Sequence, residues 1–600
     1  MEELINLERA NGVDLLNWFS AGAEAVASHK KYLNDINVFP VADGDTGTNL
    51  YTTLRGMVEK PARERSFADM LRGISESGLE SARGNSGIIF ASFVNGIALE
   101  CQPAESVDVA EFSGLAYRAV RHLYAAVEHP AEGTLMSVIR DWAMFLESNK
   151  GRFSNFRELF QSAYQSAMVS LEKTKEQLQV LRKHNVVDSG AAGFVRFLQG
   201  INLTFLRDRQ SKETEAPVAA PIVSEDGETE YRFCTEALLD TAAYTAVHGD
   251  ITAEQIKREL GLFGDSLIVN NSDGRLKIHI HTNTPELVME QLKQYGDFLE
   301  QKADDMAVQN RIRTTKQRAI GILTDSIADI PDSFKLEHAI TTLPMGVMLD
   351  GNAYLDKATI QLKQLFRRME SKDGYPTSSQ PEPARVSAML SALADQFDSL
   401  IVLSVSDRLS GTYQALRKAA ALLPEKKISI INTRLNSGAE GLLVKAAAGL
   451  VDQGLSHDEI VAQIEQMIPR TKIYVALNTL AYAVRGGRVP DTIGKLGIKL
   501  GMRPIMTLDQ AGNGAAFGVA FSQAGLTKKI MNLVRTTMQK NGIADYSIVH
   551  GDNLPLAQEY AVAITKLTGK APAFIAEISS VVALHAGPGT VAVCLLEGNA

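Results

Sequence analysis

The sequence contains few of the residues that would stabilise a disulfide-rich or membrane-spanning protein. Its three cysteines, Cys101, Cys234 and Cys594, are far apart and do not suggest a disulfide framework. No apolar run approaches the ~20 residues that a bilayer-spanning helix needs. The first residues, MEELINLERANG, are acidic and lack the basic and apolar regions of a signal peptide. These absences favour a cytoplasmic protein without a transmembrane segment.

Positive charge is also in deficit. The formal net charge is −9 and the pI is about 5.8, which argues against a general nucleic-acid-binding surface. The chain has 600 residues, of which 45% are hydrophobic and 22% are charged, as in an ordinary globular protein. Because one hydrophobic core rarely grows past roughly 250–300 residues, we expect several domains.

Hydrophobic periodicity divides the chain into three folded regions and a linker. Residues 1–206 show helical periodicity and no convincing run of alternating strands. Residues 207–229 are polar and rich in Pro, Ala and Glu, which is typical of a linker. Residues 230–315 mix strands (FCTEALL, RLKIHIHTN) with helices (AEQIKREL, ELVMEQLKQ). From residue 316 onwards, apolar β-branched runs such as AIGILTD, KIYVALN and YSIVHG alternate with helices, which indicates a parallel α/β architecture.

A glycine-bearing turn, NVFPVADGDTGTN, contains two carboxylates, Asp43 and Asp45. Carboxylates two residues apart in a turning backbone can point the same way. Mg²⁺ favours one or two such ligands together with the oxygens of a phosphate. The alternative is an ordinary surface turn, since Asp-Gly is a common turn dipeptide.

Two further stretches of the helical region have the residues of a phosphate-binding loop or of a helix N-terminus. In SARGNSGII the small residues Gly84–Gly87 open a helix and would form a phosphate cradle, but such a short motif is weak evidence and close helix packing is the better explanation from the motif alone. In VVDSGAAGF either Asp188 or Ser189 is placed as an N-cap, and capping alone would explain that pair.

The predicted strand LKIHIH places His279 and His281 on one side, because side chains alternate along a strand. With Cys234 they would satisfy three positions of a zinc-type site. The alternative is a histidine pair on a solvent-exposed face.

Two loops of the C-terminal region are rich in hydroxyl groups and follow predicted strands, where α/β folds place ligands. One is PTSSQPEP and the other begins at Ser410 and Gly411, which open a helix in a position suited to an anion. Plain N-capping is the alternative for the second loop.

The order of NVFPVADGDTGTN, SARGNSGII, EGTLMSVI and VVDSGAAGF resembles the dihydroxyacetone-kinase-type ATP-binding domain of bacterial fatty acid kinase, over nearly all of residues 1–206. The resemblance implies an all-α helical barrel that binds ATP and two Mg²⁺ ions. Asp43 and Asp45 would be metal ligands, with Asn37 a weaker candidate. It places these residues at the nucleotide: Thr46, Thr48, Asn49, Gly84, Asn85, Ser86, Gly87, Thr134, Leu135, Asp188, Ser189 and Gly190. The sequence departs from the family at Ala42, usually proline, and at Ser81, usually glycine.

The stretches YRFCTE, FGDSLIVNN and LKIHIHTNTPE resemble the central domain of the same kinase family, which implies a small α/β (α+β) domain. In that family the cysteine and both histidines are functionally required, which carries over to Cys234, His279 and His281. They would bind a metal such as Zn²⁺ or handle the phosphoryl group directly. Because this domain is a dimerisation element in the family, the resemblance also implies a homodimer.

The stretches LTDSIADIP, PTSSQPEP, LSGTYQA, LAYAVRGGRV, MRPIMTL and VVALHAGPGT resemble the DegV family of fatty-acid-binding proteins and stand in the family's order. The resemblance implies an α/β domain of two subdomains, about 316–475 and 476–600, with the acyl tail buried between them. It places Ser378, Ser379, Ser410, Gly411 and His585 around the fatty-acid carboxylate. Ser378 replaces the more usual threonine.

Arg485 and Arg488, in RGGR, resemble the positive surface that such carriers present to a kinase; the alternative is two solvated loop arginines. A peripheral membrane contact for lipid exchange is a further expectation.

Together these resemblances favour an enzyme that uses ATP to phosphorylate a fatty acid carboxylate, giving an acyl phosphate. The C-terminal domain would be the carrier, since the serine loops and the His585 turn are all present. Three alternatives are a lipid-binding or sensing protein whose kinase half is a docking scaffold, a kinase subunit that serves separate carriers, and a small-hydroxyketone kinase. The last would need a substrate domain for which the sequence has no matching region.

Overall fold

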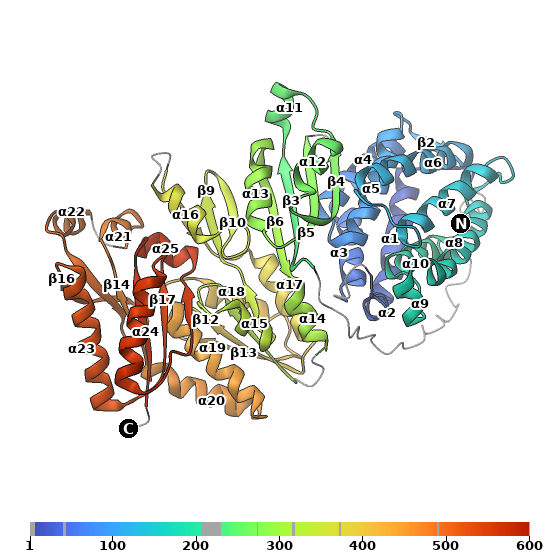
Figure 1. Ribbon diagram of the computed structural model, residues 1–600. Helices are drawn as coiled ribbons and strands as arrows, with labels where there is room; N and C mark the ends of the chain where they lie inside the picture. Colours follow the sequence, from blue (N-terminus) through green and yellow to red (C-terminus); the bar gives the residue numbers. More distant parts are fainter. Residues whose placement is uncertain are drawn as a thin grey trace. The chain divides into compact units, whose positions relative to one another are not determined.

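The computed structural model describes residues 7–39, 44–205, 230–272, 274–314, 319–370, 374–488 and 491–598, the side chains of 491–494 excepted (Figure 1). The chain divides into two compact units, residues 1–313 and residues 314–600. Asp43 and the predicted linker lie outside the described residues. Within the described part of the chain, no helix is both long and apolar enough to cross a membrane.

The first unit begins with a helical region. Its helices are α1 (Gly12–Ser28), α2 (Lys30–Asp35), α3 (Thr46–Glu59), α4 (Phe67–Ser81), α5 (Gly84–Glu100), α6 (Val109–Ala126), α7 (Leu135–Asn149), α8 (Phe156–Gln177), α9 (Gln179–His184) and α10 (Ser189–Leu203). Helices α3 to α8 pack in succession, and α10 contacts both α8 and α1, so the ring of helices closes. The prediction of a helical region is confirmed.

A short antiparallel ladder, which the sequence did not predict, joins two helix starts in this region. Strand β1 (Arg9–Asn11) pairs with β2 (Ser106–Asp108). The last residue of each strand is also an N-cap: Asn11 caps α1 and Asp108 caps α6, each in a capping box. Such a box satisfies backbone donors on both sides of the cap and so fixes where each helix begins.

The interior of the helical ring is aromatic. Trp18 of α1 lies 5.9 Å from Phe112, 5.1 Å from Phe156 and 5.0 Å from Phe160, measured between ring centroids. These rings come from α1, α6 and α8 and meet at edge-to-face or tilted angles, as aromatic pairs prefer. The core therefore ties together helices that are far apart in sequence.

A four-stranded antiparallel sheet completes the first unit. Its strands, in the order β4-β5-β3-β6, are β3 (Phe233–Asp240), β4 (Gly264–Ser272), β5 (Arg275–Thr282) and β6 (Asp297–Asp305). The accompanying helices are α11 (Ala242–His248), α12 (Ala253–Leu260), α13 (Pro285–Leu292) and α14 (Met306–Thr314). Strands β3 and β5 and helices α12 and α13 were predicted, whereas β4 and β6 were not. The sheet packs on α5 and α6, and Ile268 of β4 belongs to the same buried core as the helical ring (Figure 1).

The second unit opens with a parallel sheet of order β13-β12-β7-β8 and a small antiparallel sheet of order β10-β9-β11. The strands are β7 (Ile320–Asp325), β8 (Thr341–Leu343), β9 (Gly346–Leu349), β10 (Asn352–Leu355), β11 (Thr377–Ser379), β12 (Ser399–Ser404) and β13 (Lys427–Asn432). The helices are α15 (Asp332–Glu337), α16 (Leu362–Met369), α17 (Pro383–Ala394), α18 (Thr412–Ala420), α19 (Ser437–Asp452) and α20 (His457–Met467).

A second, mixed sheet follows, with strand order β16-β15-β14-β19-β17-β18. Its strands are β14 (Thr471–Ala476), β15 (Arg503–Leu508), β16 (Gly514–Ala520), β17 (Ile543–His550), β18 (Ile575–Glu577) and β19 (Val591–Glu597). Its helices are α21 (Ala481–Arg485), α22 (Asp491–Lys499), α23 (Gln523–Asn541), α24 (Leu554–Thr568) and α25 (Ser580–Ala586). The prediction of parallel strands is confirmed for the first sheet. In this sheet it holds only for β17 with β18, because β14 and β17 both pair antiparallel with β19.

Candidate active site

The predicted metal-binding turn leads directly into α3. Asp45 occupies the N-cap position without a side-chain capping bond, so its carboxylate is not used to start the helix. The hydroxyl of Thr48 accepts a hydrogen bond from Asn34 at 3.0 Å, and the Thr48 N–H donates to the same side chain at 3.1 Å. Asn37, the weaker metal candidate, is buried. Among the described residues, Asp45 therefore supplies the carboxylate of this turn.

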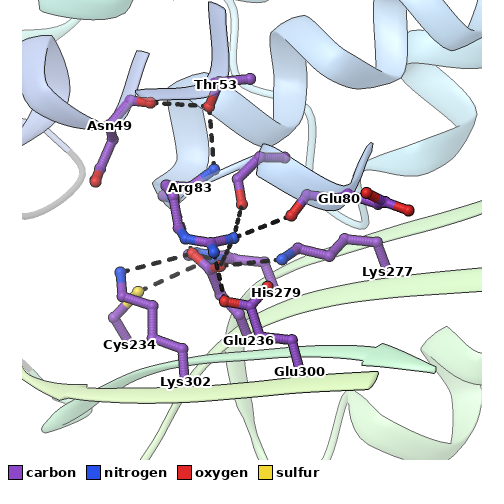
Figure 2. A network of polar contacts seen from close by, with 12 residues as sticks. Asn49, Thr53, Glu80, Arg83, Cys234, Glu236, Lys277, His279, Glu300 and Lys302 are labelled. Atoms are coloured by element: carbon purple, nitrogen blue, oxygen red, sulfur yellow. Dashed lines mark hydrogen bonds and ion pairs between the residues drawn. The ribbon is translucent and has the colours of Figure 1, made fainter. Parts of the chain in front are cut away.

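Helices α3 and α5 approach each other closely where the glycine loop begins. A Cβ on Gly84 would lie 2.3 Å from Asn49 Nδ2, and a Cβ on Gly87 would lie 2.3 Å from Thr53 Oγ1. The Thr53 hydroxyl also accepts the backbone N–H of Arg83 and donates to the Asn49 carbonyl (Figure 2). Close packing thus explains Gly87 by itself, and it brings Asn49 beside the start of α5.

The starts of α7 and α10 meet the same loop. A Cβ on Gly190 would lie 2.6 Å from Ser86 Oγ and 3.4 Å from Leu135 Cβ. Asp188 caps α10 by accepting the Ala191 N–H at 2.7 Å, and burial raises the pKa of its carboxyl to about 6. The predicted nucleotide residues on α5, α7 and α10 are therefore neighbours at converging helix N-termini, which favour anions.

Two of the remaining candidates have a structural role. Thr134 is the N-cap residue of α7, but its hydroxyl donates to the Ala131 carbonyl at 2.7 Å. The Ser189 hydroxyl donates to the Leu33 carbonyl at 2.6 Å. Both hydroxyls are engaged within the helical region.

One face of the four-stranded sheet carries mostly polar side chains in three cross-strand rows. The rows, read from β4 to β6, are Asp265–His281–Cys234–Asp304, Ile268–His279–Glu236–Lys302 and Asn270–Lys277–Leu238–Glu300. Since directly paired residues share a face, the two histidines and the cysteine lie together. Their side chains are buried, so the alternative of a solvent-exposed histidine pair is wrong.

The cluster of Cys234, His279 and His281 has the geometry of a metal site. One ligand atom from each residue lies within 4.8 Å of the others. Burial lowers the pKa of His279 to about 4, so its imidazole is neutral at physiological pH. A carboxylate lies beside each imidazole ring. Glu236 Oε1 is 3.6 Å from His279 Nδ1, and Asp265 Oδ1 is 3.5 Å from His281 Nδ1.

Glu236 is the centre of a buried ionic network (Figure 2). Its carboxylate is 1% exposed and accepts the backbone N–H of Gly84, the first residue of α5, at 2.8 Å. Lys277 lies 3.3 Å, Lys302 3.8 Å and Arg83 4.0 Å from its oxygens. Burial alone would raise the pKa of Glu236, but the surrounding lysines hold it well below its usual range. The first N–H of the predicted phosphate loop is thus already bonded to this carboxylate.

In the second unit, the predicted serine loops lie side by side. Ser379 packs against Gly346 through the β11–β9 pairing, and its neighbour Gln380 lies against Gly411, 2.3 Å from where a Cβ would be. Ser410 Oγ lies 2.8 Å from Thr412 Oγ1 at the start of α18. The structure therefore brings the loop of Ser378 and Ser379 together with that of Ser410 and Gly411.

His585 belongs to the same neighbourhood. Its helix, α25, contacts strands β9 and β11. Burial, aided by the nearby Arg488, lowers the pKa of His585 to about 4. Arg485 is exposed, but two contacts fix its side chain. It donates a hydrogen bond to the Met369 carbonyl at 2.7 Å, and its guanidinium lies 4.4 Å from the Tyr375 ring centroid.

Three stretches of the sequence match known families. Residues 40–202 match the DAK2 domain, residues 230–313 match the middle domain of fatty acid kinase-like proteins, and residues 319–598 match the family described as "Uncharacterised protein, DegV family". The chain therefore joins a DAK2 domain, a middle domain of the fatty acid kinase type and a DegV-family domain.

Two similar proteins each cover about half of this chain. The "Uncharacterized protein MG369 homolog" of Mycoplasma pneumoniae is 30% identical over 321 residues, which are 50% of this chain and 57% of that protein. A Staphylococcus saprophyticus protein, also uncharacterized, is 30% identical over 48% of this chain and 54% of its own length. The chain thus spans little more than half the length of these relatives.

Solved structures resemble the DegV domain. A DegV family protein from Thermus thermophilus, described by its fatty acid binding, is 25% identical with a TM-score of 0.42, covering 46% of this chain and 99% of its own. DegV of Bacillus subtilis, described as a fatty acid binding protein, is 22% identical with a TM-score of 0.43, covering 47% of this chain and 100% of its own.

The residues of the middle domain fit a zinc ion. Cysteine and histidine are the preferred ligands of structural zinc, and histidine ligands usually have a carboxylate or carbonyl on the second ring nitrogen. His279 Nε2 is buried and has no hydrogen-bond partner among the described residues, whereas its Nδ1 faces Glu236. In the DAK2 domain, Asp45 and the converging helix starts fit a magnesium–nucleotide complex.

Sequence reasoning missed the ionic partners of the cluster. The alternation that places His279 and His281 on one face also places Lys277 there, and Glu236 follows Cys234 by two residues. That periodicity was visible in the sequence. Lys302 was not accessible in this way, because β6 carries charges on both faces and was not predicted as a strand.

Proposed function

We propose that this protein is an ATP-dependent fatty acid kinase. In this proposal the DAK2 domain binds ATP with Mg²⁺, the DegV domain holds a fatty acid, and the product is an acyl phosphate. The observation that carries it is the proximity of two candidate centres in the first unit. Glu236, which lies 3.6 Å from His279 of the Cys234 cluster, accepts the backbone N–H of Gly84 at the start of the predicted phosphate loop, at 2.8 Å.

The DAK2 domain would bind the nucleotide through backbone donors and small side chains. The converging starts of α5, α7 and α10 supply N–H groups and positive dipole ends for the phosphates. Asp45, together with Asp43, would hold Mg²⁺. When bound, Mg²⁺ offsets the negative charge of the phosphates.

The chemistry requires positioning more than acid–base groups. A fatty acid carboxylate has a pKa near ~4–5 and is already ionised at neutral pH, so it needs no strong general base. A carboxylate oxygen forms a bond to the γ-phosphorus while the bond to the oxygen bridging toward the β-phosphate breaks, and ADP leaves. The protein therefore has to bring two anions together and hold them in line.

The DegV domain would hold the acyl carboxylate at its hydroxyl-rich loops. Ser378, Ser379 and Ser410 supply donors, Gly411 opens α18, and His585, neutral because of its low pKa, offers a ring N–H without adding charge. Burying a ~16-carbon tail between the subdomains would stabilise the complex by on the order of 10 kcal/mol at ~0.8 kcal/mol per methylene. The exposed Arg485 and Arg488 would contact the kinase domain.

The Cys234 cluster has two candidate roles, a zinc site that supports the active centre or a group that handles the phosphoryl directly. Elemental analysis of the purified chain separates them. One zinc per chain in the native protein, lost in Cys234→Ser and His281→Ala variants, would support the metal role. Full activity in a protein proven free of zinc would contradict it.

The test of the proposed function is native mass spectrometry of the full chain before and after addition of ATP and Mg²⁺. We expect a co-purified fatty acid that gains one phosphoryl group. Bound lipid that never changes would point to a lipid sensor or to a kinase that needs separate carriers. A protein without lipid would contradict the carrier role of the DegV domain.

A further inference from the structure

Lys302 lies in an unusual position for a lysine. Its side chain is 18% exposed and stands on β6 in the same cross-strand row as Glu236 and His279. Its ammonium group lies 2.8 Å from Asp304 Oδ2 and 3.8 Å from Glu236 Oε1. In Figure 2 the side chain points to the same side of the sheet as the Cys234 thiol. The cation is therefore placed at the candidate metal cluster.

Lys302 is also linked to the DAK2 domain through Glu236, which accepts the backbone N–H of Gly84 at 2.8 Å. Burial alone would lower the pKa of its ammonium group, but Asp304, Glu236, Cys234 and Asp45 together hold that pKa well above its usual range. Asp45 belongs to the turn before α3 and Cys234 to the middle domain. Lys302 is thus a charged group that shares Glu236 with the start of the predicted phosphate loop.

A second cation, from the same segment of the chain, reaches the turn before α3. Helix α14 follows β6 directly, and the guanidinium carbon of Arg313 lies 2.6 Å from the position that a Cβ on Gly44 would take. The segment β6–α14 therefore carries Arg313 to the turn that contains Asp45 and Lys302 to the Cys234 cluster. This arrangement is independent of the contacts within the sheet.

We propose that Lys302 is a catalytic residue whose ammonium group contacts the phosphoryl group during its transfer from ATP. This inference rests on the proposed function, because it assumes that phosphoryl transfer occurs beside Asp45. The ammonium group donates hydrogen bonds to the oxygens of the transferring phosphoryl and keeps its protons throughout. The bond that forms and the bond that breaks are those of the reaction above.

The competing explanation is structural: Lys302 would only neutralise Glu236 and Asp304. Lys277 is the matched control for this explanation. It stands on the same sheet face, lies 3.3 Å from Glu236 and is more deeply buried, with 2% of its side chain exposed. The charges that act most strongly on it are Glu236, Arg83 and Glu300, all within the network.

The experiment compares the full-length wild type with Lys302→Met, Lys302→Arg and Lys277→Met. Acyl phosphate formation is measured together with the affinity for ADP and Mg²⁺, with and without aluminium fluoride as a mimic of the transferring phosphoryl. Loss of one such donor typically lowers kcat ~10²–10³-fold. We expect a loss of that size in Lys302→Met, a change of less than ~10-fold in ADP affinity, partial rescue by arginine, and a much smaller loss in Lys277→Met.

The two readouts separate the inference from the proposed function. Equal losses of kcat in Lys302→Met and Lys277→Met would overturn the catalytic role and leave the kinase assignment intact. If the wild type forms no acyl phosphate, the fatty acid is not the acceptor and the proposed function fails. The role of Lys302 is then tested by ADP affinity in the presence of aluminium fluoride. Tighter ADP binding that is lost only in Lys302→Met would support the inference, whereas tightening that is absent in the wild type or equal in both variants would overturn it.

Discussion

At the scale of single residues, Gly87 illustrates how helix packing and ligand binding compete to explain a glycine. Replacing it with alanine would put a Cβ 2.3 Å from Thr53 Oγ1, inside a buried contact. We expect Gly87→Ala to lower the free energy of unfolding of the first unit by about 1–3 kcal/mol, as overpacking does. Urea titration followed by circular dichroism measures this.

The control for Gly87 is Gly449, which lies in α19 with no atom within 4 Å of its would-be Cβ. There alanine is the better helix former, so Gly449→Ala should stabilise the second unit by up to ~1 kcal/mol. A Gly87→Ala protein as stable as the wild type would show that α3 and α5 can separate without cost.

Asp188 provides a pH-dependent prediction at the same scale. Burial raises the pKa of its carboxyl from 3.8 to about 6, so the folded protein favours the protonated form. Stability from this residue is therefore greatest below pH ~4 and is lost as the pH rises through 6. We expect Asp188→Asn, which keeps the N-cap, to be more stable than wild type at pH 7.5 by on the order of 2 kcal/mol and nearly equal at pH 4.

The measurement is the difference in urea midpoints between Asp188→Asn and wild type at the two pH values. Taking the difference removes the pH dependence common to both proteins. A difference that does not change with pH would contradict a raised pKa for the buried Asp188 carboxyl.

At the scale of secondary-structure elements, a buried polar network joins α5 of the DAK2 domain to β4 of the middle domain. Asn95 Nδ2 donates to Asn270 Oδ1 at 3.0 Å, and Asn270 Nδ2 donates to Ser92 Oγ at 3.0 Å. Ser75 completes it with a 3.0 Å bond to Asn95. Removing Asn270 leaves buried donors and acceptors unpaired, so we expect Asn270→Ala to destabilise the first unit by about 1–3 kcal/mol.

A double-mutant cycle of Asn95→Ala and Asn270→Ala tests whether these elements are coupled directly. We expect a coupling energy of about 0.5–3 kcal/mol from this contact. Asn271→Ala is the control, because the Asn271 side chain donates to Ile251 within the middle domain. Coupling of Asn95 to Asn271 as strong as to Asn270 would mean that the effect is transmitted through the whole sheet.

Elements also show which parts of the fold the sequence could predict. The shared face of His279 and His281 follows from strand alternation, but its burial does not, because the covering helix α5 lies far earlier in the chain. Strands β14 and β17 were read as parallel because apolar β-branched runs look alike in any buried strand. Their antiparallel pairing is set by β19, at the far end of the sequence.

The candidate site also has a part that the sequence could predict and a part that it could not. The order of the motifs predicted the candidate residues around Asp45 and at the helix starts, each from within one segment. The roles of Glu236 and Lys302 depend on contacts between β3, β6 and the start of α5. No single segment of the sequence predicts these contacts.

At the scale of the whole molecule, the division into two compact units predicts two separable unfolding transitions. The DAK2 and middle domains share a core through Ile268 and an ionic network through Glu236, so they should unfold together. The DegV domain has its own cores and should unfold independently. Each ligand should therefore raise only the transition of the unit that binds it.

Differential scanning calorimetry of the full chain tests this with two ligands added separately. A ligand at 100 times its Kd stabilises the state that binds it by about 2.7 kcal/mol, which shifts a Tm by several degrees. We expect ATP analogue with Mg²⁺ to raise one transition and a long-chain fatty acid to raise the other. An Asp45→Asn variant should lose the first shift and keep the second. If both ligands raised the same transition, the carboxylate and the nucleotide would bind one unit, and the DegV domain would not be the carrier.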